Sequence, residues 1–245
     1  MSYDQEKRDK KYNLWARKYP AFVSLVFPLL GIIYVFFGGV EGIDGIKKVY
    51  SDIEVVLKVF LVFGSIIPAL FFLYIFSVRE IAITLIPRVM NWLFEINTNK
   101  LLLSTDNTFS EERKQIIKQK IQQKYQIQIP DTEKKYKLPF RRDREYRKKV
   151  NEAVTLIRED TRPDPILFEH NCIYGFYRNL AGGLLLDLII VTILLFVNQR
   201  YGSNHEELLN WFAYIIAAIF VMSLVFDRTS GKRYATRLYI VFLKI

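Results

Sequence analysis

The sequence predicts an all-α polytopic membrane protein, in which two transmembrane hairpins flank a small helical cytoplasmic domain. Three observations predict this fold. Four long runs of the chain carry almost no charge, the basic residues gather between and outside those runs, and the polar region between the second and third runs has apolar residues at helical spacing. Few segments show the alternating pattern of a strand.

Each of the four apolar runs has the length of a membrane span. Residues 21–40, 59–78 and 208–226 carry no charge, and residues 179–197 carry only Asp187. At about 1.5 Å per residue, such helices reach the roughly 30 Å of a bilayer's hydrocarbon core. The first run is too long for a signal peptide and lacks an Ala-x-Ala-like cleavage site, so we interpret it as a retained span.

The basic residues predict the orientation. Lys and Arg number six in residues 1–20, twenty in 79–178 and five after 226, but two in 41–54 and one in 198–207. We expect the protein in the inner (plasma) membrane. By the positive-inside rule, both termini and the middle segment then face the cytoplasm. The expected parts are a basic N-terminal segment (1–20), hairpin 1 (21–78), a cytoplasmic helical domain (79–178), hairpin 2 (179–226) and a basic amphipathic tail (227–245).

The cytoplasmic domain is expected to begin with a juxtamembrane helix over residues 81–96, kinked at Pro87. Its polar residues Arg88, Asn91 and Glu95 share one face. This pattern fits either an extension of the second span that packs on its neighbours or an amphipathic helix in the headgroup region.

Two further helices are predicted in the domain. The first starts at a capping box formed by Thr108 and Glu111 and ends before Pro130, with one apolar stripe of Ile116, Ile117, Ile121 and Tyr125. The second covers residues 143–160, with a stripe of Tyr146, Val150, Val154 and Ile157. Two such helices bury little by themselves, so we expect a third partner: the juxtamembrane helix, the base of the spans or another subunit.

The tail is expected to form a short helix at the membrane surface. Lys232, Arg233 and Arg237 would face phosphates, and Leu238 and Phe242, with their apolar neighbours, would face lipid or protein.

Glu169, His170 and Cys172 stand close together before the third span. A thiol nucleophile needs an imidazole within hydrogen-bond reach and a third group to orient it, and residues two apart on a helix face different directions. We therefore predict no catalytic residues here; the lone cysteine also excludes an intramolecular disulfide. Aromatic and basic residues at the entry of a span are typical of an interface belt, and the predicted collar comprises Glu169, His170, Asn171, Tyr174, Tyr177, Arg178 and Asn179.

Asp187 is the main candidate for a membrane-embedded polar or gating residue. It lies eight residues into the third span, where a carboxyl costs a few kcal/mol unless it faces a partner or water. The candidate partners at similar depth are Ser24, Tyr74, Ser77, Ser223 and Arg178. A packing hydrogen bond and a wet pore lining are both consistent with this position.

Small residues in every span favour close helix packing, either within the subunit or between copies. Ala213 and Ala217 form a small-xxx-small pair in the fourth span. This pattern is consistent with a homo-oligomer.

A basic patch with interleaved aromatic residues lies in residues 134–149. Such a patch suits anionic lipid, a nucleotide or nucleic acid, and a solvated basic surface near an anionic leaflet has the same composition. No nucleotide-binding glycine motif and no metal-ligand spacing is present, so neither a cofactor nor a metal is expected. The candidate anion-binding residues are Lys134, Lys135, Lys137, Arg141, Arg142, Arg144, Arg147, Lys148 and Lys149.

The order of elements resembles a broad group of bacterial membrane proteins without an assigned activity. The resemblance rests on a basic helix closing in YQIQIP, a second helix ending LIREDTRPDPILFEHN and YGFYRNLAGG entering a span, and it covers roughly residues 110–190. It implies a bacterial inner-membrane setting and this helix order, but no activity.

These features favour a non-enzymatic protein: an oligomeric inner-membrane effector or accessory subunit whose cytoplasmic domain receives a soluble partner or ligand and alters the membrane part. Pore-forming proteins of bacterial antiviral defence have this architecture, which is an analogy only. The alternatives are a passive anchor that tethers a soluble protein or nucleic acid through residues 113–149, and a membrane enzyme or transporter.

Overall fold

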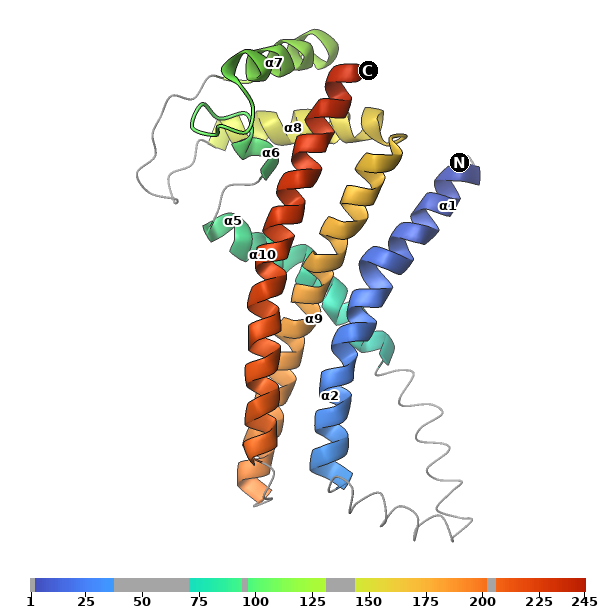
Figure 1. The fold of residues 1–245 in the computed structure, drawn as a ribbon, viewed down its shortest axis with the longest axis vertical. Helices are drawn as coiled ribbons and strands as arrows, with labels where there is room; N and C mark the ends of the chain where they lie inside the picture. Colours follow the sequence, from blue (N-terminus) through green and yellow to red (C-terminus); the bar gives the residue numbers. More distant parts are fainter. Residues whose placement is uncertain (1–2, 38–70, 94–96, 131–143, 202–205) are drawn as a thin grey trace. The chain divides into compact units, whose positions relative to one another are not determined.

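The computed structural model describes residues 3–37, 71–93, 97–130, 144–201 and 206–245 (Figure 1). The regular structure of these residues is helical and contains no strand, which confirms the all-α prediction. Among them, Pro165–Val197 and Glu207–Lys244 are long and apolar enough, by length and composition, to cross a membrane. This finding supports membrane association. The predicted spans at 21–40 and 59–78 lie partly outside the described residues, and the count of four spans is not confirmed.

The chain divides into two compact units. The first, here called the bundle unit, comprises Met1–Ile86 and Phe176–Leu224, and the second, the insert unit, comprises Pro87–Gly175 and Val225–Ile245. Two long helices, α9 (Pro165–Tyr201) and α10 (Glu206–Lys244), supply residues to both units. The third and fourth predicted spans are therefore sections of longer helices.

The bundle unit begins with a continuous helical stretch: α1 (Tyr3–Tyr12), the π-helix η1 (Asn13–Lys18) and α2 (Tyr19–Phe37). Residues 71–80 are also helical and lead into a second π-helix, η2 (Ile81–Leu85). Leu184 and Val191 of α9 form an apolar cluster with Ile216 of α10, and Phe27 of α2 packs against it. The three helices thus share one small core within this unit.

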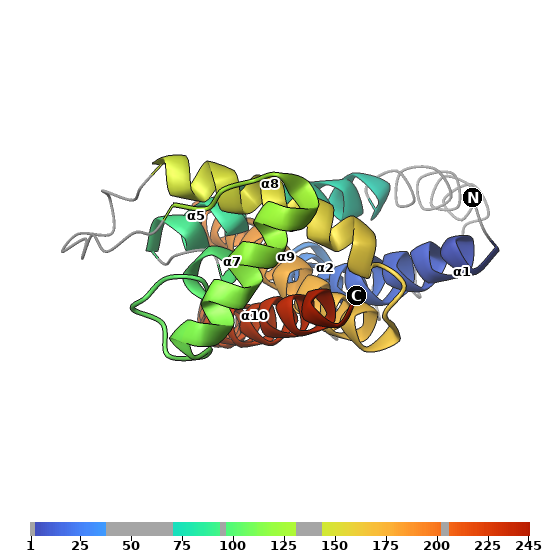
Figure 2. The same ribbon diagram turned by 90° about the horizontal axis from the view of Figure 1, so that it is seen from above.

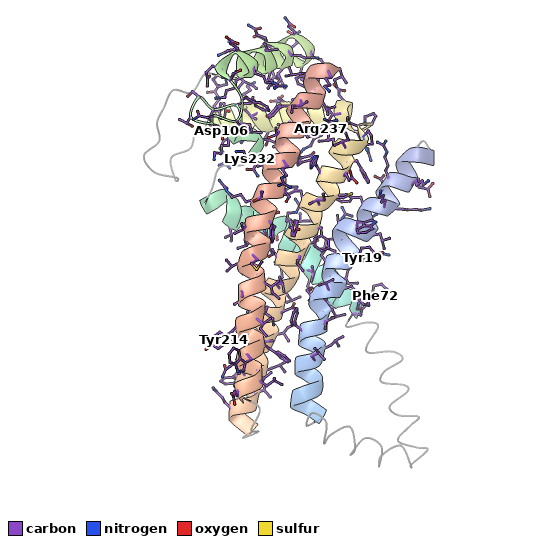
Figure 3. The ribbon with its side chains drawn as sticks, in the orientation of Figure 1. Tyr19, Phe72, Asp106, Tyr214, Lys232 and Arg237 are labelled. Carbon is purple, nitrogen blue, oxygen red and sulfur yellow. The ribbon has the colours of Figure 1, made fainter. Side chains whose placement is uncertain are left out.

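Large apolar side chains cover the outside of the bundle unit. Phe72, Phe196 and Tyr214 are 71%, 71% and 68% exposed, and Figure 3 shows Phe72 and Tyr214 at the periphery. A water-soluble protein buries most side chains of this size, whereas lipid tails are as apolar as they are. The pattern fits a surface in contact with acyl chains.

The juxtamembrane helix differs from its prediction in the position of its irregular turn. Helix α5 (Ile86–Leu93) contains Pro87, and the π-helical turn η2 lies immediately before it. Proline has no N–H to donate to the preceding turn, and a widened turn is one way for a helix to accommodate this loss. Glu95, part of the predicted polar face, lies outside the described residues.

The insert unit also contains α6 (Asn97–Lys100), α7 (Glu111–Tyr125) and α8 (Arg144–Thr161). The predicted capping box at Thr108 is wrong by two residues, because Ser110 is the N-cap of α7 and its hydroxyl accepts a 3.3 Å hydrogen bond from the N–H of Arg113. The N–H of Thr108 instead bonds to the Asp106 carboxylate at 2.9 Å. The helix ends at Tyr125, before Pro130, since Gln126 has a left-handed conformation with φ of 60°.

Helix α9 begins at Pro165, directly after Asp164, and both residues favour the start of a helix. The Asp164 carboxylate accepts a 2.6 Å hydrogen bond from the N–H of Leu167, and Pro165 occupies the first helical position, where its missing N–H costs nothing. The other carboxylate oxygen of Asp164 accepts a 3.2 Å bond from Arg237, near the end of α10. This ion pair joins the start of α9 to the C-terminal part of α10.

The third partner of α7 and α8 is the C-terminal part of α10. Figure 2 shows α7, α8 and the end of α10 close together. Ile117 of α7, Ile157 of α8 and Leu238 of α10 are all fully buried in one core, and Lys120 on α7 donates a 3.2 Å hydrogen bond to the carbonyl of Leu243. The tail differs from the predicted short helix because it continues α10, and its apolar side chains pack on protein, one of the two surroundings expected for them. This C-terminal segment was not among the three expected partners.

Candidate functional site

The bundle unit contains a chain of hydrogen bonds that links three of its helices. The Tyr74 hydroxyl donates to Oδ1 of Asp187 at 2.6 Å, and the hydroxyls of Ser24 and Tyr74 lie 2.8 Å apart. Because the Tyr74 hydrogen goes to Asp187, Ser24 is the donor to Tyr74, and its single hydroxyl hydrogen is shared with the carbonyl of Ala21 at 3.2 Å. Since Ser24 lies on α2, Tyr74 on the helical residues 71–80 and Asp187 on α9, this cluster joins all three; it is here called the polar cluster.

The polar cluster is shielded from solvent. Ser24 and Asp187 have no exposed surface, and Tyr74 is 8% exposed. Apolar side chains surround them, with Leu25, Ile75 and Leu186 packed nearby. In such surroundings a hydrogen bond to a carboxyl is stronger than in water, and an unbonded polar atom is costly.

One carboxyl oxygen of Asp187 has no such bond. Its Oδ2 atom is buried and is hydrogen-bonded to none of the described residues. A buried carboxyl oxygen without a donor costs about 1–3 kcal/mol, and more if the group is charged. The site therefore has an unused acceptor that a proton, a water molecule or a cation would satisfy.

Two glycines let α9 approach the other helices closely. A Cβ atom on Gly183 would lie 2.2 Å from the Ser24 hydroxyl oxygen and 2.7 Å from its Cβ, and one on Gly182 would lie 2.9 Å from the Val78 carbonyl oxygen. No real Cβ tolerates such distances. The pair of glycines one turn before Asp187 thus determines that Ser24 and Tyr74 come within reach of the carboxyl.

The other candidate partners of Asp187 do not join it. Among the described contacts, Asp187 is bonded to Tyr74 alone, so no ion pair connects it to Arg178. Ser223 is buried but donates to the carbonyl of Phe220 at 2.7 Å within its own helix. The small-residue pattern of the fourth span also has a use inside the subunit, because Ala213 packs against the cluster around Ile216.

The predicted collar is one uninterrupted stretch of α9. Glu169 is exposed, His170, Asn171, Tyr177 and Arg178 are partly buried, and Asn179 is only 3% exposed. Tyr174 stacks on Tyr234 of α10 with ring centroids 6.1 Å apart. Cys172 is buried. Within the described residues no group of three or more His, Cys, Asp or Glu side chains is placed to hold a metal ion.

Only part of the predicted basic patch lies in the described structure. Lys134, Lys135, Lys137, Arg141 and Arg142 fall outside it, whereas Arg144, Arg147, Lys148 and Lys149 lie on α8.

The aromatic residue within the described part of the patch, Tyr146, faces the core. It is 3% exposed, and its hydroxyl donates a 2.8 Å hydrogen bond to the carbonyl of Asn99. A ring in this position cannot stack on a base.

Sequence reasoning missed a polar hub around α6. The carbonyl of Thr98 accepts a 2.9 Å hydrogen bond from Tyr239, and the neighbouring carbonyl, that of Asn99, accepts the bond from Tyr146. Asp106, nearby in sequence, is 5% exposed, and Figure 3 shows it on the same side of the unit as Lys232. The cluster of Asn, Thr and Asp residues over 97–108 was the available signal, since these residues terminate helices and form turns.

Comparisons of the chain with protein-family models, with curated proteins and with solved structures find no significant match.

Proposed function

We propose that this protein is a four-span inner-membrane effector or accessory subunit without enzymatic activity, and that the polar cluster holds its membrane part in a resting state. A soluble partner or ligand at the insert unit would shift the protein to a second state in which water reaches Asp187 and ions pass. The observation that carries this proposal is the fully buried Asp187, bonded at one oxygen to Tyr74 and at the other to no described residue.

The free-energy cost of placing a carboxyl inside a membrane helix favours a functional role for Asp187 over a purely structural one. An asparagine or serine could bond to Tyr74 equally well without the penalty of an ionisable group inside a membrane helix. A carboxyl with one buried oxygen bonded to none of the described residues is therefore a poor choice for packing alone. It suits a site that becomes hydrated in another state, in which its charge would attract cations.

The burial of Asp187 also bears on the kind of pathway. Its side chain has no exposed surface in a single chain, so a central pore between copies would not meet it in this state. We propose that the pathway opens within the subunit, by separation of α9 from Ser24 and Tyr74. Association into a homo-oligomer through the exposed apolar surface is compatible with this pathway. Native mass spectrometry of the protein in nanodiscs measures the number of subunits.

Cation flux from proteoliposomes tests the proposal. Because no trigger is identified, the resting state is weakened by Tyr74→Phe, which removes the hydrogen bond to Asp187. We expect flux to rise about tenfold, since loss of a buried hydrogen bond worth about 1–3 kcal/mol shifts a two-state equilibrium by roughly five- to 150-fold. Adding Asp187→Asn should return the flux toward the wild-type level.

Thr192→Val is the matched control. Thr192 lies on the same helix, is exposed and donates its hydroxyl hydrogen to the carbonyl of Leu188 at 2.7 Å. The substitution should leave the flux unchanged. Flux that is equal in wild type, Tyr74→Phe and the double variant would overturn the proposed pathway.

A passive anchor is the second candidate, and the self-contained core of the insert unit favours it. This function predicts that a soluble partner or nucleic acid binds the full-length protein in nanodiscs and that charge reversal of Arg141, Arg142, Arg147, Lys148 and Lys149 abolishes the binding. The burial of Tyr146 weighs against single-stranded nucleic acid as that partner.

A further inference from the structure

A cavity of about 460 Å³ lies in the bundle unit, where α1 and η1 meet the helical residues 71–80 and the start of the bundle section of α9. Four cationic side chains line it: Lys10, Arg17, Lys18 and Arg79. Lys10, Arg17 and Lys18 lie within nine residues of one another, whereas Arg79 lies 61 residues after Lys18, and in the sequence all four were only part of the overall basic excess. Their convergence on one cavity is a product of the tertiary structure.

The polar lining of the cavity is suited to an anion. The lining residues include no carboxylate, and besides the cations they include the amides of Asn13 and Asn179. Asn179 is 3% exposed, so this amide is held in place by its surroundings. Arg17 donates a 2.7 Å hydrogen bond to Asn13, which orients the guanidinium.

Lys10 has an ion-pair partner on its own helix. Lys10 forms a 2.8 Å ion pair with Glu6, but both side chains are well exposed. Exposed pairs at this spacing contribute little, so the pair leaves Lys10 available to an anion.

The remaining wall of the cavity is apolar. Leu14, Ile75 and Val78 form it. Inorganic phosphate or a free nucleotide phosphate gains nothing from such a wall. A phospholipid does, because its glycerol and upper acyl carbons follow directly after the phosphate.

The neighbouring aromatic residues place the cavity at the depth of lipid headgroups. Trp15 and Tyr19 are 51% and 42% exposed and form an edge-to-face pair with centroids 5.1 Å apart; Tyr19 is labelled in Figure 3. Trp and Tyr are enriched where membrane helices leave the hydrocarbon core. The apolar run of α2 begins immediately after this pair.

We propose that this cavity binds the phosphate headgroup of an anionic phospholipid, with the phosphate among the four cations and the first acyl carbons against Leu14, Ile75 and Val78. The proposal goes beyond the proposed function: it rests on insertion into a membrane and is independent of ion passage.

Lipid retention by the full-length protein tests the proposal. The protein is placed in nanodiscs of equal parts phosphatidylglycerol and phosphatidylcholine, released into the gas phase and examined by native mass spectrometry. We expect retained phosphatidylglycerol in the wild type. Lys10→Gln with Lys18→Gln should reduce this retention by about 25-fold, since one basic residue near an anionic surface contributes about fivefold.

The matched control is Lys7→Gln with Lys11→Gln. It removes the same two charges from neighbouring positions that do not line the cavity, and it should leave retention unchanged. If circular dichroism shows that the Lys10 and Lys18 variant loses helix, Arg79→Gln replaces it, with the exposed Arg88→Gln as control.

Two results would overturn the assignment. Equal loss in the cavity variant and its control would show diffuse attraction to the basic surface. Full displacement of the lipid by excess inorganic phosphate would show that the site takes a free anion and has no use for the acyl chain. Neither result bears on flux from proteoliposomes, so failure of this assignment and failure of the proposed function are distinguishable.

Discussion

The hydroxyl of Tyr74 lies 2.6 Å from the carboxylate of Asp187 and donates its hydrogen to it, across 113 residues of sequence. The same hydroxyl lies 2.8 Å from that of Ser24. Tyrosine is thus the central member of the polar cluster, since without its hydroxyl the serine and the carboxyl lose their connection.

Replacing Tyr74 by Phe tests this central role by stability. The variant leaves both oxygens of Asp187 without a donor among the described residues, so we expect a loss of about 1–3 kcal/mol in the local stability of the bundle unit. Hydrogen exchange of the amides of residues 184–190 in the detergent-solubilised protein measures it. Tyr214→Phe makes the same change at a side chain that is 68% exposed and should have no effect. Equal protection in the two variants would contradict the role given to Tyr74.

Any side chain at Gly183 is predicted to destabilise the protein as long as Ser24 retains its own side chain. In Gly183→Ala the new Cβ would meet the Ser24 hydroxyl at 2.2 Å and its Cβ at 2.7 Å, which forces α9 away from α2. We expect a loss of about 1–3 kcal/mol, typical of an overpacked site, and a lower thermal midpoint.

The double variant Gly183→Ala with Ser24→Gly should recover part of that midpoint, because the side chain that clashes is gone. A double variant that is less stable than the wild type by the sum of the two single effects would indicate that the two residues do not touch.

The adjacent isoleucines of α7 provide a matched pair for the core of the insert unit. Ile117 is fully buried, whereas Ile116 is 54% exposed. Ile117→Ala should cost about 2–5 kcal/mol, the usual range for a truncated buried side chain, and Ile116→Ala well under 1 kcal/mol. Hydrogen exchange of α7 and α8 amides in the full-length protein compares them. Similar losses of protection would place both side chains in the core and contradict the packing of α7.

Acid should weaken the insert unit through Asp164. Burial raises the pKa of this carboxyl, but hydrogen bonds from the Leu167 N–H and from Arg237 outweigh burial and hold the pKa below its ordinary value. A carboxyl with a lower pKa in the folded state than in the unfolded state stabilises the fold above the unfolded pKa, about 4, and this stabilisation is lost as the pH falls through the folded value. Protection of the insert unit should therefore decline below about pH 4.

Asp164→Asn should flatten this decline, because the group that titrates is removed. Glu152→Gln, at an exposed position of α8, is the control and should retain the acid sensitivity of the wild type. Hydrogen exchange measured at pH 7, 4 and 3 with correction for the intrinsic exchange rates makes the comparison. An unchanged decline in Asp164→Asn would assign the acid sensitivity to other carboxyls, such as Asp106.

Several features were predictable because they depend on neighbours in sequence. The helical class follows from the spacing of apolar residues, and the ends of α8 lie within one residue of the predicted 143–160. The need of Asp187 for a partner follows from its place in an apolar run, and Ser24 and Tyr74 were both on the list of candidates. The cap of α7 was misplaced by two residues because Ser110 and Thr108 are both good N-caps, and only the path of the chain chooses between them.

By itself, then, the sequence determined the helical class, the uneven charge along the chain and the presence of one carboxyl that requires compensation. Only the tertiary structure decided that Tyr74 supplies the bond, that the end of α10 completes the core around Ile117 and Ile157, and that Arg79 lines the same cavity as three cations of the N-terminal segment. The physical reason is the range of the interactions. Helix periodicity and charge are properties of adjacent residues, whereas partners depend on which helices approach closely, and here that approach depends on side chains as small as those of Gly182 and Gly183.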